Sequence, residues 1–104
     1  MSNLSADFGV SEFLDLHQLH CSVKDRYIDL VSETGELGKE ILTGSDYGKQ
    51  AFALTDKMID EMGDSLFSIL ALCAEMGIDP ESAVKQSLEK YRKRLKEKGT
   101  AGSS

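Results

Sequence analysis

The chain has 104 residues, 40% of them hydrophobic and 29% charged, and its formal net charge is −6. This length fits one small domain that buries limited apolar surface by itself, so we expect it to assemble with other chains. The acidic balance argues against a nucleic-acid partner, which needs a basic surface. No membrane partner is expected either, because the longest apolar run is about half of the ~20 residues that a membrane span needs.

The N-terminal residues lack the basic segment followed by an apolar one that typifies a signal peptide. The two cysteines, Cys21 and Cys73, do not have the spacing of a metal site or a disulfide framework. A cytoplasmic location is therefore expected.

An all-α fold is predicted, because the chain has a single proline and few alternating β-branched runs. Four helices are expected, covering roughly residues 11–24, residues 26–42, a segment from beyond Tyr47 to Met76, and a last segment from Pro80 onward. Asp79 is expected to cap the last helix, with Pro80 at its first position. Its apolar positions follow helical spacing: Val84, Leu88, Tyr91 and Leu95. We expect one domain over residues 1–98, with a disordered tail at 99–104 and disorder in the first several residues.

A short acidic sequence motif occurs twice in the chain. LVSETGELGKEIL (residues 30–42) aligns with MIDEMGDSLFSIL (residues 58–70). The matched polar positions are Glu33 with Glu61, Gly35 with Gly63, and Glu36 with Asp64. A single E-x-x-E pair usually marks a solvated helix face, but two matched copies with the same relation to the apolar residues are hard to attribute to chance.

Successive residues of a helix are about 100° apart, which places each acidic pair at the border of the apolar face. Glu40 falls on the same edge of its helix as Glu33 and Glu36. If the two helices pack antiparallel, the acidic edges can face each other across the seam. Carboxylates gathered there would repel unless a cation neutralised them, and hard divalent cations such as Mg²⁺ favour oxygen ligands. Gly35 and Gly63 each cost roughly 1 kcal/mol inside a helix, which close approach of another helix or a ligand would explain.

The combination of E-x-G-E-L and E-x-G-D-x-L-F closely resembles the MazG-like all-α nucleotide pyrophosphohydrolases, over about residues 27–94. The resemblance includes the G-I-D-P-E-S-A-V turn and the basic K-Y-R-K-R segment. It implies an all-α fold of the four-helix bundle type. It also implies assembly as a homodimer, or as a homotetramer that is a dimer of dimers. It also implies Mg²⁺-dependent hydrolysis of a nucleoside triphosphate to the monophosphate and pyrophosphate, with Mn²⁺ as an alternative cation.

The resemblance assigns the metal ligands to the two acidic pairs: Glu33, Glu36, Glu61 and Asp64. Glu36 and Glu40 are both candidates by position for the general base that accepts the water proton. The chain departs from the family at Ser32, where many members carry a further glutamate, and it lacks the tryptophan often found in the N-terminal region.

Lys90 and Arg94 share one face of the last helix and are candidates for binding substrate phosphates. The alternative is a solvated helix whose basic end suits its dipole. His17 and His20 have no acid or cysteine obviously spaced with them for a metal site, although either could line a nucleotide pocket.

The predicted substrate is a (d)NTP or a non-standard nucleotide. Two alternative functions stay open. One is phosphoribosyl-ATP pyrophosphohydrolase, an activity of the same superfamily. The other is a non-catalytic helical interaction module that retains the fold without binding a metal.

Overall fold

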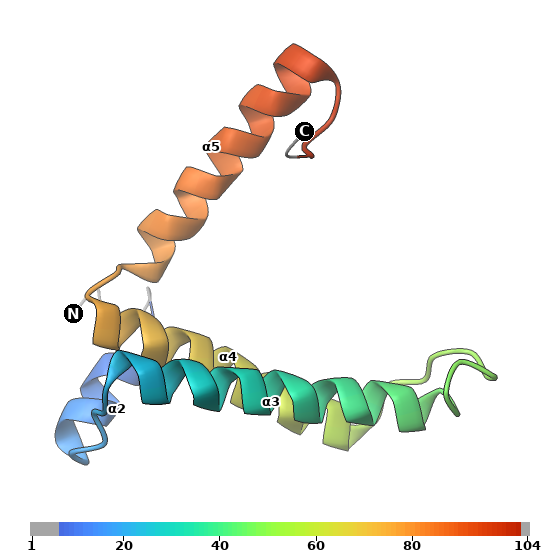
Figure 1. Cartoon of the computed structure of the whole chain (residues 1–104), viewed down its shortest axis with the longest axis horizontal. Coiled ribbons are helices and arrows are strands. Elements are labelled where there is room, and N and C mark those ends of the chain that lie inside the picture. Colours follow the sequence, from blue (N-terminus) through green and yellow to red (C-terminus); the bar gives the residue numbers. More distant parts are fainter. Residues whose placement is uncertain (1–6, 103–104) are drawn as a thin grey trace.

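The structure of the protein is a computed structural model, and residues 7–102 are described. It contains four helices, α2 (Val10–Leu16), α3 (Val23–Gly44), α4 (Asp56–Met76) and α5 (Pro80–Lys98). Residues 7–102 contain no strand, so the predicted all-α class is confirmed (Figure 1).

Side-chain caps fix where the three long helices begin. The Ser22 hydroxyl accepts a hydrogen bond from the Asp25 N–H at 3.0 Å, so α3 begins three residues earlier than predicted. Thr55 caps α4 through the Met58 N–H, which defines a start that the sequence left open. Asp79 accepts from the Ser82 N–H ahead of Pro80, as predicted for the last helix. Each cap satisfies a backbone donor that the first helical turn leaves free.

The prediction that the first helix runs toward Lys24 is wrong, because α2 ends at Leu16. The segment that follows is held against the C-terminal part of α4 instead. The His20 ring contacts the Asp15 carboxylate through Nε2 at 2.5 Å and the Glu75 carboxylate through Nδ1 at 2.9 Å, and the Cys21 N–H donates to the same Glu75 oxygen. Hydrogen bonding to Asp15 and then Glu75 raises the pKa of His20. These contacts turn the chain between α2 and α3.

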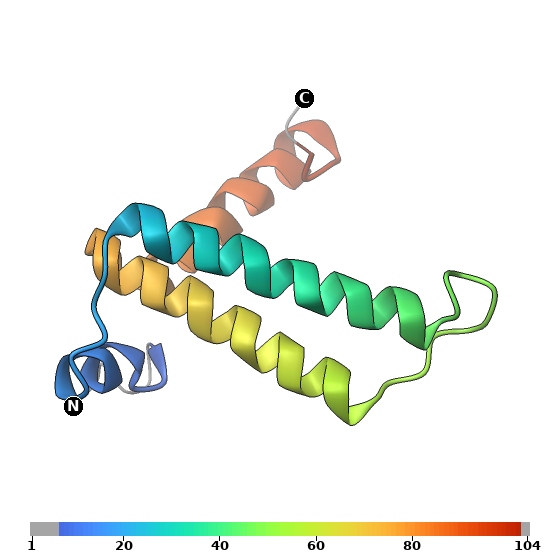
Figure 2. The ribbon, with the colours of Figure 1, turned by 60° about the horizontal axis from the view of Figure 1, so that its bottom comes forward.

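α3 and α4 lie side by side and antiparallel, joined by residues 45–55 (Figure 2). α2 packs against α4. Its Leu14 is fully buried and forms a small core with Val10 and Ala71, which Phe67, Leu70 and Ala74 surround. This core holds α2 against α4. The interface between α3 and α4 is separate from it.

α5 packs along none of the other described helices and leads away from the α3–α4 pair (Figure 1). None of its residues is buried. The apolar positions predicted for a packing face are all exposed: Val84, Leu88, Tyr91 and Leu95. A four-helix bundle is therefore not completed within one chain, because the last helix has no packing partner in it.

The described part of the tail follows Gly99, which ends α5 in the left-handed conformation. The Arg94 guanidinium donates to the Ala101 carbonyl at 3.4 Å, so this part of the tail contacts α5. The disorder predicted for the first several residues and for Ser103 and Ser104 lies outside the described residues. No helix within residues 7–102 is long and apolar enough to cross a membrane.

Candidate metal centre

The face of α4 that packs on α3 is unusually polar. Its buried positions recur at helical spacing: Met58, Glu61, Ser65, Ser68 and Leu72. Glu61 is only 7% exposed, although an ionised carboxylate is seldom buried without a partner. A buried acid in a helix seam points to a binding role more than to packing.

Three carboxylates converge at this seam. One oxygen from each of Glu33, Glu61 and Asp64 lies within 4.8 Å of the other two. Glu33 is half-buried on α3, while Asp64 is exposed at the edge of the seam. None of the three forms an ion pair with any residue between 7 and 102. The donor set consists of oxygens alone and carries uncompensated negative charge, which fits a hard divalent cation.

The electrostatics of the group follow from this crowding. Burial raises the pKa of Glu61, and the nearby Asp64 carboxylate raises it further. Glu33 behaves in the same way, since burial and then repulsion from Asp64 raise its pKa. Both shifts mean that the folded chain disfavours the ionised form of these groups. A bound cation would reverse that preference.

The other two predicted acids lie outside the three-carboxylate group. Glu36 is exposed, yet its charge adds to the rise in pKa of both Glu33 and Glu61, so it lies near them. Glu40 is half-buried one turn further along α3. The structure thus brings together three of the four predicted ligands. The roles of Glu36 and Glu40 stay predictions.

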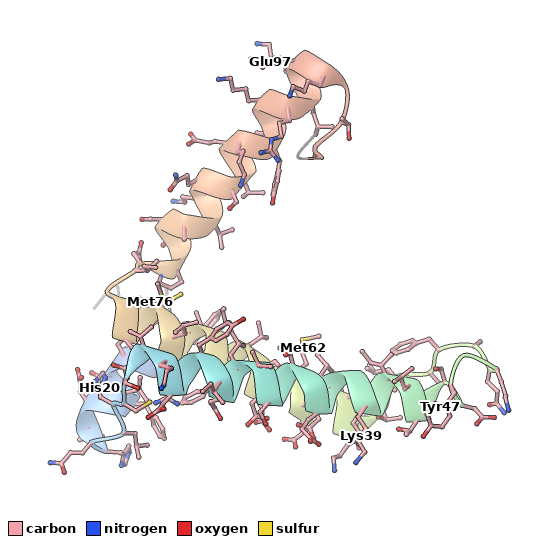
Figure 3. The ribbon with its side chains drawn as sticks, viewed as in Figure 1. His20, Lys39, Tyr47, Met62, Met76 and Glu97 are labelled. Carbon is pink, nitrogen blue, oxygen red and sulfur yellow. The ribbon has the colours of Figure 1, made fainter. Side chains whose placement is uncertain are left out.

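Lys90 and Arg94 are not brought to the seam within one chain. Both flank the ring of Tyr91, with the Lys90 ammonium 5.1 Å and the Arg94 guanidinium carbon 5.8 Å from its centroid. Because α5 leads away from α3 and α4, as Figure 3 also shows, these cations belong to a different surface of the same chain.

Sequence reasoning missed the neighbours of the acidic group. The Ser68 hydroxyl donates to the Asp29 carboxylate at 3.0 Å across the seam. Asp29 precedes Glu33 by four residues, and Ser65 and Ser68 follow Glu61 by four and seven, so helical spacing placed all of them on the seam. Asp29 lies just before the repeated segment, which begins at Leu30.

The fold and the site together define an all-α protein with a cluster of three carboxylates between two antiparallel helices. The sequence profile of the MazG nucleotide pyrophosphohydrolase domain matches residues 24–98. The chain belongs to this family, which confirms the resemblance found in the sequence. No curated protein and no solved structure gave a significant match to the chain.

Proposed function

We propose that this chain is a Mg²⁺-dependent pyrophosphohydrolase that converts a nucleoside triphosphate, either a (d)NTP or a non-standard nucleotide, to the monophosphate and pyrophosphate. The observation that carries the proposal is the convergence of Glu33, Glu61 and Asp64 at a seam inside the region that matches the family.

The proposed metal ligands are Glu33, Glu36, Glu61 and Asp64, with Glu36 reaching the group by rotation of an exposed side chain. A Mg²⁺ or Mn²⁺ ion held there would screen a triphosphate and lower the pKa of a bound water. Glu36 and Glu40 are the candidates to take up the proton of the attacking water, since both share the acidic edge of α3 with Glu33, Glu36 exposed and Glu40 half-buried.

A homodimer or a homotetramer is part of the proposal. The exposed stripe of α5 and an apolar groove of about 690 Å³ between α4 and the start of α5 offer surfaces for a second copy of the chain. Leu66, Phe67, Leu70 and Val84 are among the residues that line the groove. An α5 supplied by a second copy could bring its Lys90 and Arg94 toward the seam, where they would bind substrate phosphates.

The test is pyrophosphate release from a panel of nucleotides with Mg²⁺ or Mn²⁺. Wild type is expected to act on at least one nucleotide, and Glu61→Gln to lower the rate at least about 100-fold, because it removes a ligand charge from the cluster. Asp56→Asn, an exposed acid more than one turn away on the same helix, is the matched control and is expected to keep the rate. Equal activity of wild type and Glu61→Gln would refute the proposal.

The same panel separates the alternatives. Activity on phosphoribosyl-ATP alone would favour phosphoribosyl-ATP pyrophosphohydrolase. A calorimetric titration that shows no uptake of Mg²⁺ or Mn²⁺ would favour a non-catalytic interaction module. The location in the cytoplasm stays a prediction.

A further inference from the structure

The seam continues beyond the three-carboxylate group, toward the N-terminal end of α3. Asp29 lies on α3 one helical turn before Glu33, and it accepts a hydrogen bond from Ser68 of α4 at 3.0 Å. Ser68 in turn lies on α4 one turn beyond Asp64. The antiparallel pair therefore has two carboxylate-bearing levels: Glu33 with Glu61 and Asp64, then Asp29 with Ser68.

Ser65 lies between these two levels. It follows Glu61 by four residues and precedes Ser68 by three, so all three share the buried face of α4. Ser65 is 7% exposed, and its hydroxyl oxygen is buried without a hydrogen-bond partner in the described part of the chain. A buried hydroxyl without a partner in the protein is expected to bond to a group outside the chain, an ordered water or an ion.

The usual explanation for a serine within a helix does not apply here. Such a hydroxyl commonly donates to the backbone carbonyl four residues earlier. Ser45 does this at the end of α3, where its hydroxyl donates to the Ile41 carbonyl at 2.9 Å. Ser65 makes no such bond, although it sits in the middle of a regular helix.

Asp29 also has ligand capacity to spare. Both of its contacts use Oδ2, the hydrogen bond from Ser68 and an ion pair with Arg26 at 3.8 Å. Within residues 7–102, Oδ1 forms neither a hydrogen bond nor an ion pair. Carboxylate and serine oxygens are both ligands that divalent cations accept in phosphate-handling sites.

We propose that Asp29 and Ser65, together with Glu33, form a second position for a divalent cation, one helical turn along the seam from the position formed by Glu33, Glu61 and Asp64. This inference rests on the proposed function, because it extends the same acidic centre. It assigns Asp29, which lies outside the repeated motif, to metal binding. Two cations on a shared carboxylate are a recurrent arrangement in enzymes that cleave phosphate esters and anhydrides.

The test counts bound cations in the full chain, with no substrate and no activity readout. Mn²⁺ is titrated into metal-free protein, and free Mn²⁺ is followed by electron paramagnetic resonance. Wild type is expected to bind two Mn²⁺ per chain. Asp29→Asn, which keeps the shape and the acceptor for Ser68, is expected to bind one, and Ser65→Ala to weaken one of the two about tenfold.

Asp25→Asn is the matched control, an exposed acid one turn earlier on α3, and it is expected to retain both ions. One Mn²⁺ in wild type, or two Mn²⁺ of unchanged affinity in Asp29→Asn, would overturn the inference. If Glu61→Gln loses an ion while Asp29→Asn does not, the inference fails and the proposed centre stands. If wild type binds no Mn²⁺, both fail.

Discussion

α4 and α5 are amphipathic helices of similar length, 21 and 19 residues, but only α4 is packed against other helices of this chain. α4 buries six residues against α2 and α3, whereas α5 buries none. The apolar positions of α5 recur at helical spacing, yet all of them are exposed in this chain. Periodicity thus identifies a face that must be covered but not the chain that covers it.

The two regions also invert the usual distribution of polarity. The α3–α4 seam buries Glu61, Ser65 and Ser68, while α5 exposes Leu88 and Tyr91. Buried polar groups and exposed apolar stripes are the informative departures from an ordinary interior and surface. We propose that the first marks a cation site and the second a surface for a second copy of the chain.

One expected effect tests the exposed side of this comparison, the apolar stripe of α5. Leu88→Asp places a charge in the centre of the α5 stripe and is expected to raise the dissociation constant of the oligomer at least tenfold. Sedimentation velocity would measure this. Lys93→Asp, half a turn round the same helix, is the control that changes charge without touching the stripe. Retention of the oligomer by Leu88→Asp would show that α5 is not the contact surface.

The packed side is tested through the core between α2 and α4. Leu14 is fully buried, so Leu14→Ala is expected to lower the free energy of unfolding by about 2–5 kcal/mol. Leu16 on the same helix is 74% exposed, and Leu16→Ala is expected to change the free energy of unfolding by less than about 0.5 kcal/mol. Urea denaturation followed by circular dichroism measures both. Equal effects of the two variants would contradict the described packing.

The raised pKa values at the acidic seam predict how the stability of the metal-free protein depends on pH. Because the folded chain raises the pKa of Glu33 and Glu61 above 4.5, their ionisation destabilises the metal-free fold. Stability is therefore lost as pH rises from about 4.5 through these raised values. At pH 7.5 without metal, Glu61→Gln is expected to melt at a higher temperature than wild type, and the two should converge near pH 4.

Added Mg²⁺ is expected to stabilise wild type, because a ligand that binds only the folded state stabilises that state. The order of the two melting temperatures at pH 7.5 is expected to reverse, with wild type above Glu61→Gln. An order that is the same with and without Mg²⁺ would show that the cluster does not bind the cation.

The smallest expected effect concerns the two motif glycines. A Cβ at Gly35 or at Gly63 would meet nothing within 4 Å in the single chain, so the close approach of a neighbouring helix expected from sequence is absent within it. Gly35→Ala should therefore stabilise the metal-free protein by up to about 1 kcal/mol. Gly63 lines the apolar groove, and Gly63→Ala should instead weaken the oligomer. Thermal melts and sedimentation separate the two outcomes.

Much of the fold could be predicted because the signals were local. Asp79 with Pro80 defined the start of α5, and the repeated acidic design placed Glu33 opposite Glu61 and Asp64. The first helix could not be delimited, because its end depends on His20 reaching Glu75, which is 55 residues away in the chain. Contacts of that kind leave no periodic trace in the sequence.

The same distinction applies to the centre. The paired carboxylates were found because their spacing repeats, whereas Asp29 and Ser65 carry no motif and gain meaning only from the register of the helix pair. The position of α5 relative to the seam was equally beyond local reasoning, so bringing Lys90 and Arg94 to the seam remains a proposal that needs a second chain.

The helix pair that bears the acidic seam has a further consequence for how the protein is made. Every residue of the three-carboxylate group lies in one helical hairpin, and the hydrogen bond from Ser68 to Asp29 spans only 39 residues. Low sequence separation favours rapid formation, whereas the proposed pairing of α5 with a second copy would require an encounter between chains. Under the proposed function, a cation would bind this hairpin within a single chain, before any pairing of α5 with a second copy.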